Sequence, residues 1–158
     1  MSLAALSLGE VLEREAREAL AFVELLKKEQ AMLVEGNVDG LLPLVDQKSA
    51  FTARLGELGD ARESIINEAG AGSGRSGMET FLSRQPADRA LRSRWEALLA
   101  VASEAQALNQ TNGKLIRLHL QHNQQAMNTL LAAANQATTY GPDGHQRPAG
   151  SGRFLGSA

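Results

Sequence analysis

The sequence predicts an all-α protein: an elongated antiparallel helical hairpin, a third long helix and a flexible C-terminal tail. Apolar residues recur at steps of three and four along three long stretches, which is the helical period. Nine of the 15 glycines lie in two short stretches, 70–77 and 141–156, and no stretch reads as a strand. We therefore expect one coiled-coil-like helical domain over residues 1–137 and a tail over 138–158.

The first helix is predicted over residues 8–35. Ser7 and Glu10 have the spacing of a capping box, and the Gly36-Asn37 pair is typical of a left-handed helix end. Between these signals the apolar positions repeat with helical spacing, at Leu8, Val11, Leu12, Ala19, Phe22, Val23, Leu26 and Leu33.

The second helix follows after only a few residues, so the two helices are expected to form an antiparallel hairpin over residues 8–68. Asp39 is a candidate N-cap, and Pro43 is tolerated in the first turn. Two charged residues, Lys48 and Arg62, interrupt a heptad-like apolar stripe. The apolar members of that stripe are Leu41, Leu44, Phe51, Leu55, Leu58 and Ile65.

A glycine-rich joint at residues 69–77 is not expected to hold a regular helix. The third helical segment, residues 78–137, comprises a short piece before Pro86 and a long helix after it. About fifty helical residues would extend ~76 Å, whereas a compact chain of this length is about 40 Å across. The molecule is therefore elongated, or this helix bends, for which Gly113 is the natural place.

Composition excludes several classes of function. The chain has 158 residues and no cysteine, which excludes disulfides, thiolate zinc sites and a cysteine nucleophile. A formal net charge of −2 argues against nucleic-acid binding through bulk charge. No apolar run approaches the ~20 residues of a membrane span, and the N-terminus lacks the apolar segment of a secretory leader.

No constellation of residues predicts catalysis, a metal or another cofactor. The glycine stretch 70–76 lacks the spacing and the lysine of a phosphate-binding loop. His119 and His122 lie on neighbouring helical positions, but no carboxylate or third histidine lies within a helical turn of them. The carboxylates lie among lysines and arginines on solvated helix faces. A general acid and a general base need burial that moves their two pKa values apart, and nothing in the sequence predicts such burial.

The segment 106–136 has an unusual composition, with 11 Asn and Gln residues but only two charged ones, Lys114 and Arg117. Depletion of charge is typical of the core of a protein interface. Such a face offers apolar contact and neutral hydrogen bonds to an amphipathic helix. The alternatives are that the segment packs on the hairpin or self-associates as a coiled coil.

Four motifs that occur in order resemble the FlgN family of flagellar export chaperones. They are Arg94-Trp95-Glu96-Ala97-Leu98, Leu108-Asn109-Gln110-x-Asn112-Gly113, His122-Asn123-Gln124-Gln125-Ala126 and Tyr140-Gly141-Pro142-Asp143-Gly144. The resemblance is strongest over residues 94–146. It departs from the family pattern at the glycine-rich joint.

The resemblance implies a cytoplasmic, non-enzymatic, all-α chaperone. Such chaperones bind the C-terminal helices of the hook–filament junction proteins FlgK and FlgL, prevent their premature assembly and deliver them to the export gate component FlhA. The substrate-binding candidates that it implies are Leu108, Asn109, Asn112, Leu115, Ile116, His119, Asn123, Met127 and Leu130. The candidates for docking at the export gate are Tyr140, Gly141, Asp143 and Gly144.

Two other functions compete with this reading. A homo-oligomeric coiled-coil scaffold would use the same apolar stripes for self-association and would ignore junction-protein segments. A metal-dependent helical-bundle enzyme is the other, and only His119 and His122 favour it.

Overall fold

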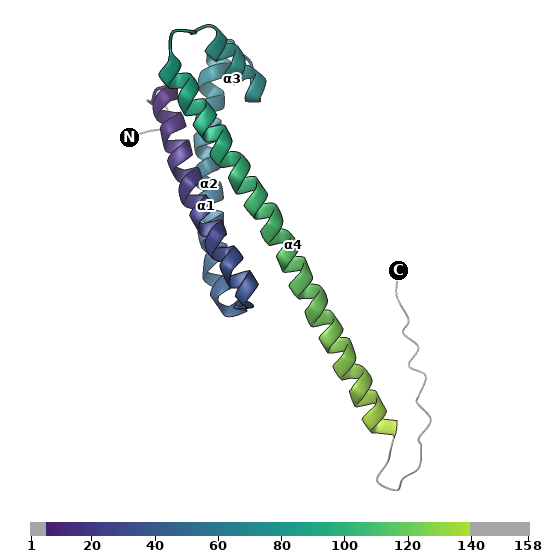
Figure 1. The fold of residues 1–158 in the computed structure, drawn as a ribbon. Coiled ribbons are helices and arrows are strands. Elements are labelled where there is room, and N and C mark those ends of the chain that lie inside the picture. Colours follow the sequence, from purple (N-terminus) through teal and green to yellow (C-terminus); the bar gives the residue numbers. More distant parts are fainter. Residues whose placement is uncertain (1–5, 140–158) are drawn as a thin grey trace. The chain divides into compact units, whose positions relative to one another are not determined.

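The computed structural model describes the backbone of residues 6–139 and the side chains of residues 6–133. Four helices and no strands occur in this part of the chain, which confirms the all-α prediction. The helices are α1 (Leu8–Glu35), α2 (Val38–Glu68), α3 (Gly74–Ser83) and α4 (Arg89–Thr139) (Figure 1). The chain divides into a first unit, Met1–Ile116, and a second unit, Arg117–Ala158.

The predicted bounds of α1 are confirmed at both ends. Ser7 forms a capping box with Glu10: its hydroxyl accepts from the Glu10 N–H, and its own N–H donates to the Glu10 carboxylate at 2.8 Å. The backbone N–H of Ser7, followed by its hydroxyl, lowers the pKa of Glu10 below the ordinary 4.5. The contribution of this carboxylate to stability is therefore present above pH 4.5 and is lost as the pH falls through the lowered value. Gly36 ends α1 with a φ of 72°, in the left-handed region.

The start of α2 differs from the prediction in its cap. Asn37, not Asp39, is the N-cap, and its side-chain oxygen accepts from the Gly40 N–H at 3.0 Å. Asn caps a helix as well as Asp does, and it directly follows the glycine that ends α1. Asp39 lies in the first turn, and Pro43 lies inside the helix beyond that turn.

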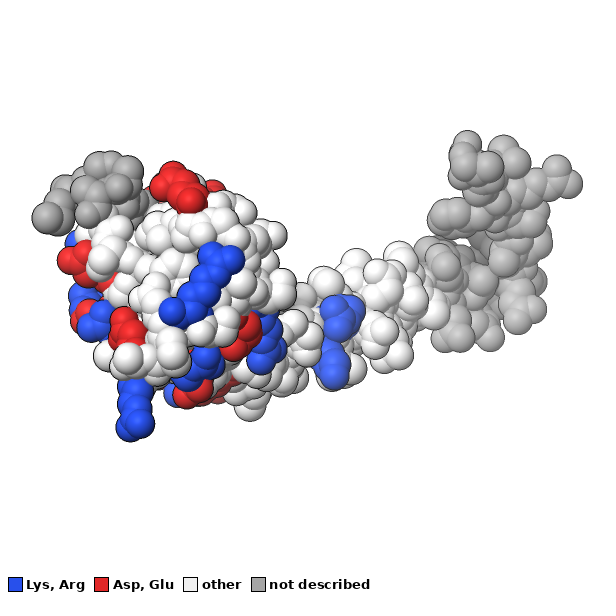
Figure 2. Space-filling view, turned by 90° about the horizontal axis from the view of Figure 1, so that it is seen from above, with Lys and Arg blue, Asp and Glu red and all other residues white. Residues whose placement is uncertain are grey.

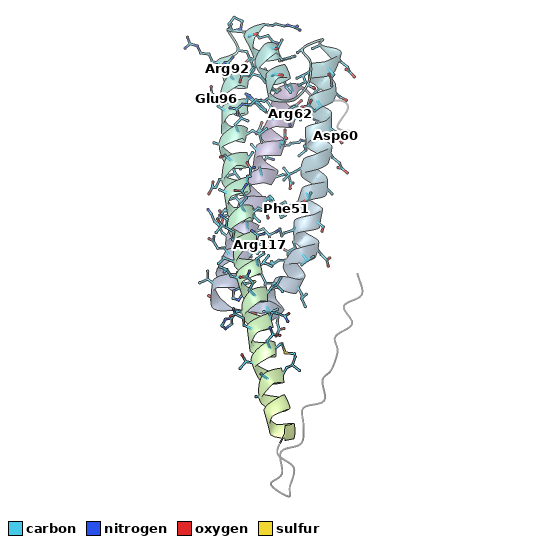
Figure 3. The ribbon with its side chains drawn as sticks, turned by 90° about the vertical axis from the view of Figure 1, so that its right-hand side faces the viewer. Phe51, Asp60, Arg62, Arg92, Glu96 and Arg117 are labelled. Carbon is cyan, nitrogen blue, oxygen red and sulfur yellow. The ribbon has the colours of Figure 1, made fainter. Side chains whose placement is uncertain are left out.

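Cross-helix contacts confirm that α1 and α2 form an antiparallel hairpin. The residue numbers of the α1 partners increase as those of the α2 partners decrease, which is the mark of antiparallel helices. Glu15 pairs with Arg62, and Glu29 pairs with Lys48. Between these pairs, the rings of Phe22 and Phe51 lie 5.8 Å apart. Figure 3 labels Phe51 and Arg62 along α2. The two-residue connection leaves no other arrangement for two packed helices of this length.

The short helix α3 begins earlier than predicted, because it takes in Gly74 and Gly77 from the glycine-rich joint. The Glu63 carboxylate accepts from the Gly74 N–H at 2.9 Å, which places a negative charge at the positive end of the helix. A β-carbon on Gly77 would lie 2.8 Å from the Gly72 carbonyl carbon, so the close approach of the backbone requires glycine there. Burial of Met78 and other apolar residues of α3 outweighs the ~1 kcal/mol cost of each helical glycine.

Helix α4 begins at Arg89 and continues as one helix through Gly113 to Thr139, two residues into the predicted tail. Its first turns complete the hydrophobic core of the first unit. The core residues come from all four helices and the α2–α3 connection: Leu8, Leu12, Ala19, Ile66, Ala71, Met78, Leu82, Leu91, Trp95 and Leu98. Among the described helices, none has both the length and the apolar content to cross a membrane.

Candidate functional site

The structure places the nine predicted substrate-binding residues in two environments along α4. Five belong to the first unit, where α4 runs parallel to α1, with Arg94 near Glu13 and Glu104 near Lys27. These five are Leu108, Asn109, Asn112, Leu115 and Ile116. The other four, His119, Asn123, Met127 and Leu130, belong to the second unit.

Asn112 is completely buried in the first unit. Its side-chain N–H group donates to the Leu26 carbonyl and to the Glu29 carboxylate, both at 2.9 Å. The Glu29 carboxylate also lies 3.1 Å from the Lys48 ammonium, which in turn donates to the side chain of Asn109. These five residues, which we call the amide latch, therefore join α1, α2 and α4.

The amide latch gives two of the predicted binding residues a role inside the chain. Leu108 and Leu115 are half-buried, and Asn109 and Ile116 are the exposed members of the first-unit group. Sequence reasoning missed the latch, although one signal was available. Lys48 interrupts the apolar stripe of α2, and a charge at a core position requires a partner.

The described part of the second unit presents an exposed apolar face, which we call the α4 face. Its four large side chains are 56–65% exposed: Leu120, Met127, Leu130 and Leu131. Their spacings of three, four and seven residues place them on one side of the helix. Leu118 precedes Met127 by two and a half turns and therefore points to the opposite side.

The α4 face has almost no charge around it. Between residues 117 and 133, Arg117 is the sole Lys, Arg, Asp or Glu, while Asn and Gln supply neutral donors and acceptors. Figure 2 shows charged side chains gathered over the helices of the first unit and few on the exposed part of α4. His119 is half-buried, and Asn123 is exposed.

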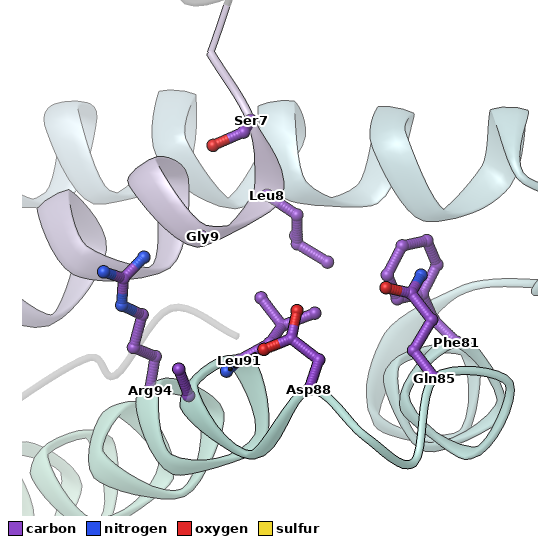
Figure 4. Close-up of a pocket in the computed structure, with 9 residues that line it drawn as sticks. Ser7, Leu8, Gly9, Phe81, Gln85, Asp88, Leu91 and Arg94 are labelled. Atoms are coloured by element: carbon purple, nitrogen blue, oxygen red, sulfur yellow. Dashed lines mark hydrogen bonds between the residues drawn. The ribbon is translucent and has the colours of Figure 1, made fainter.

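Other candidate chemistry does not come together in the described residues. Within residues 6–133, no three His, Cys, Asp or Glu side chains are grouped as a metal site requires. An open pocket of about 390 Å³ lies beside the start of α1, lined in part by Ser7, Asp88 and Arg94 (Figure 4). Ser7 caps α1, and Asp88 accepts from the Leu91 N–H at 3.0 Å, so both side chains stabilise helix ends.

Comparison with known proteins decides the family. A sequence model of the FlgN protein family matches residues 1–148, which include both the amide latch and the α4 face. The chain belongs to the FlgN family. No solved structure matches it.

Two FlgN relatives match along nearly their whole length. The flagella synthesis protein FlgN of Yersinia enterocolitica is 32% identical over 157 residues, which cover 93% of this chain and 97% of the relative. That of Proteus mirabilis is 27% identical over 151 residues, covering 94% and 96%. The predicted docking residues of this FlgN chain, Tyr140, Gly141, Asp143 and Gly144, lie within the family match but outside the described residues.

Proposed function

We propose that this FlgN-family chain is a cytoplasmic, non-enzymatic flagellar export chaperone. It binds the C-terminal helices of the hook–filament junction proteins FlgK and FlgL, prevents their premature assembly and delivers them to the type III export gate. Family membership and the names of the relatives support a role in flagellum synthesis. The observation that carries the finer proposal is the α4 face.

An amphipathic helix of a junction protein exposes its apolar face before assembly, unless a partner covers that face. The α4 face supplies four large apolar side chains, and each stabilises a complex by ~1.5–3 kcal/mol if it is fully buried. Burying this face desolvates almost no charge, whereas each buried unpaired ion would cost several kcal/mol. The neutral amides around it can still hydrogen-bond to a polar rim on the partner.

We propose that the substrate-binding residues are the exposed predicted candidates other than Asn109 and their exposed neighbours, together with the half-buried His119. The exposed ones are Ile116, Leu120, Asn123, Met127, Leu130 and Leu131. Asn109 and Asn112 belong to the amide latch. In this proposal they hold α4 against the hairpin and do not bind the substrate. Half-buried Leu108 and Leu115 act in the same way.

Replacing Met127 and Leu130 together by Asp is expected to weaken binding of the FlgK and FlgL C-terminal segments at least about a hundredfold. Two buried apolar side chains contribute at least ~3 kcal/mol, and each tenfold in affinity corresponds to ~1.4 kcal/mol. Isothermal titration calorimetry with each purified segment measures the loss. Circular dichroism must show that helicity is retained.

The matched control is Leu118→Asp, the same change on the opposite side of the same helix, at a side chain that is 60% exposed. It should leave binding within about threefold of the parent chain. Equal losses in the control and the double variant would refute a face-specific site. A stable oligomer in light scattering that ignores both segments would instead establish the coiled-coil scaffold.

For Tyr140, with Gly141, Asp143 and Gly144, we propose docking at the export gate component FlhA. Tyr140→Ala should leave calorimetric binding of FlgK and FlgL segments unchanged and weaken binding to the cytoplasmic part of FlhA at least tenfold. An aromatic anchor typically contributes this much at an interface. Unchanged binding to FlhA, with normal secretion of junction proteins, would remove Tyr140 from the site.

A further inference from the structure

The closed end of the hairpin carries a second exposed apolar surface, which we call the tip stripe. Val38, Leu42 and Val45 occupy positions i, i+4 and i+7 of α2 and are 60, 71 and 57% exposed. Val34, 71% exposed, lies just across the two-residue connection on α1. The three α2 side chains therefore share one face over about two helical turns.

The fold does not use the tip stripe. On this part of α2, Leu44 is the buried side chain, whereas Val38, Leu42 and Val45 do not belong to the buried hydrophobic residues of the first unit. Large aliphatic side chains gathered on an exposed face typically mark an interaction surface.

The tip stripe has an acidic rim. From residue 30 to residue 47 the chain has three acidic residues, Glu35, Asp39 and Asp46, and no Lys or Arg. All three are exposed, and none forms an ion pair within the described residues. Glu13, Glu24 and half-buried Glu18 of the hairpin do pair with arginine or lysine, Glu18 with Arg54 at 2.9 Å. Glu57, Asp60 and Glu68, farther along α2, are exposed and form no ion pair within the described residues either, so it is the complete lack of Lys and Arg that distinguishes the rim.

Helix stability does not account for the whole rim. Asp39 suits the first turn of α2, where the helix dipole favours a negative charge. Glu35 is the last residue of α1, where the same dipole disfavours a carboxylate, and no basic residue lies in that turn. Pro43 has no N–H, which leaves the carbonyl oxygen of Asp39 without its usual helical donor.

We propose that the tip stripe is a docking surface for an amphipathic helix of another protein, with an apolar face flanked by Lys and Arg. The apolar face covers Val38, Leu42 and Val45, and the basic residues meet the acidic rim. Charge complementarity selects this partner, because an anionic lipid surface would be repelled by the same rim. The surface lies on residues 34–46 and is additional to the α4 face.

The test uses the full chain and a synthetic amphipathic helical peptide with leucines on one face and lysines on either side. Fluorescence anisotropy of the labelled peptide measures binding, and a peptide with glutamates in place of the lysines is compared. The lysine peptide should bind at least tenfold more tightly than the glutamate peptide. Val38→Ser with Leu42→Ser should weaken it at least tenfold, whereas Leu20→Ser, a 52% exposed position elsewhere on the hairpin, should not.

Charge reversal provides the second arm. Glu35→Lys with Asp46→Lys changes two exposed positions without touching the core, and it should reverse the preference in favour of the glutamate peptide. Equal binding of both peptides, no binding, or binding indifferent to the serine variant would each overturn the proposal. So would a dimer, seen by analytical ultracentrifugation, that Leu42→Ser dissociates and the peptide does not, because the occupant would then be a second copy.

Discussion

Arg62→Ala is expected to lower the free energy of unfolding of the first unit by about 3–5 kcal/mol, the range for removing one partner of a buried ion pair. Arg62 donates to both oxygens of Glu15, at 3.0 and 3.3 Å, and to Glu63 at 2.9 Å. Its guanidinium also lies 5.4 Å from the ring centre of Trp95. Without Arg62, the carboxylate of Glu15, whose side chain is only 9% exposed, would remain buried and uncompensated.

Arg62 connects three helices directly and the fourth, α3, through Glu63. Glu15 is on α1, Arg62 and Glu63 are on α2, and Trp95 is on α4. Glu63 in turn accepts from the N–H of Gly74, the first residue of α3. Loss of the guanidinium should therefore destabilise the first unit as a whole, without selective fraying of one helix.

Urea denaturation followed by circular dichroism measures the effect. Arg54→Ala is the matched control, because Arg54 also pairs with a glutamate of α1, Glu18, but its side chain is 47% exposed. Screening by water limits such a pair to under about 1 kcal/mol. If the Arg62 and Arg54 variants unfold at the same urea concentration, the buried network does not have the role described.

Asn112→Asp is expected to release α4 from the hairpin at the amide latch. The substitution removes two hydrogen-bond donations and places a second carboxylate beside that of Glu29 in a fully buried position. An unpaired charge in such a place costs at least about 3 kcal/mol. Side-chain Oδ1 of Asn112 already lacks a hydrogen-bond partner within the described residues, so no donor is available there for the new carboxylate.

Hydrogen exchange detected by mass spectrometry measures this release as lost protection over residues 105–116. The control is Asn109→Asp, three positions earlier, which keeps an oxygen acceptor for the Lys48 ammonium and is exposed. Protection there should be retained or increased. Equal protection of this segment in both variants would contradict the latch.

Periodicity was sufficient to predict the helices of the hairpin, because each buries one face against the other and the spacing of apolar residues reports that face. The cap of α2 was missed because Asn37 and Asp39 are chemically equivalent as caps, and only the chain path distinguishes them. The start of α3 was missed because its glycines are poor helix formers. Tertiary burial and the carboxylate of Glu63 outweigh that preference.

The exposed apolar face of α4 was predicted in part. The low charge of α4 after residue 106 is visible in the sequence, and it does mark an exposed apolar face from Leu120 onward. The same composition also covers Asn109 and Asn112, whose partners lie more than 60 residues away along the chain. No local pattern separates an amide that binds within the chain from one that faces solvent. Lys48 and Arg62, the two charges in the apolar stripe, were the available signals for both polar networks.

Trp95 gives the molecule an intrinsic spectroscopic reporter. It is the single tryptophan of the chain, is 4% exposed, and its indole N–H donates to Glu79 of α3 at 3.3 Å. Its emission therefore reports on the packing of α3 and α4 near Arg62. Residues 117–133 contain no tryptophan or tyrosine, so events there require an extrinsic label. Intrinsic fluorescence and a dye on α4 together would separate unfolding of the first unit from partner binding in one sample.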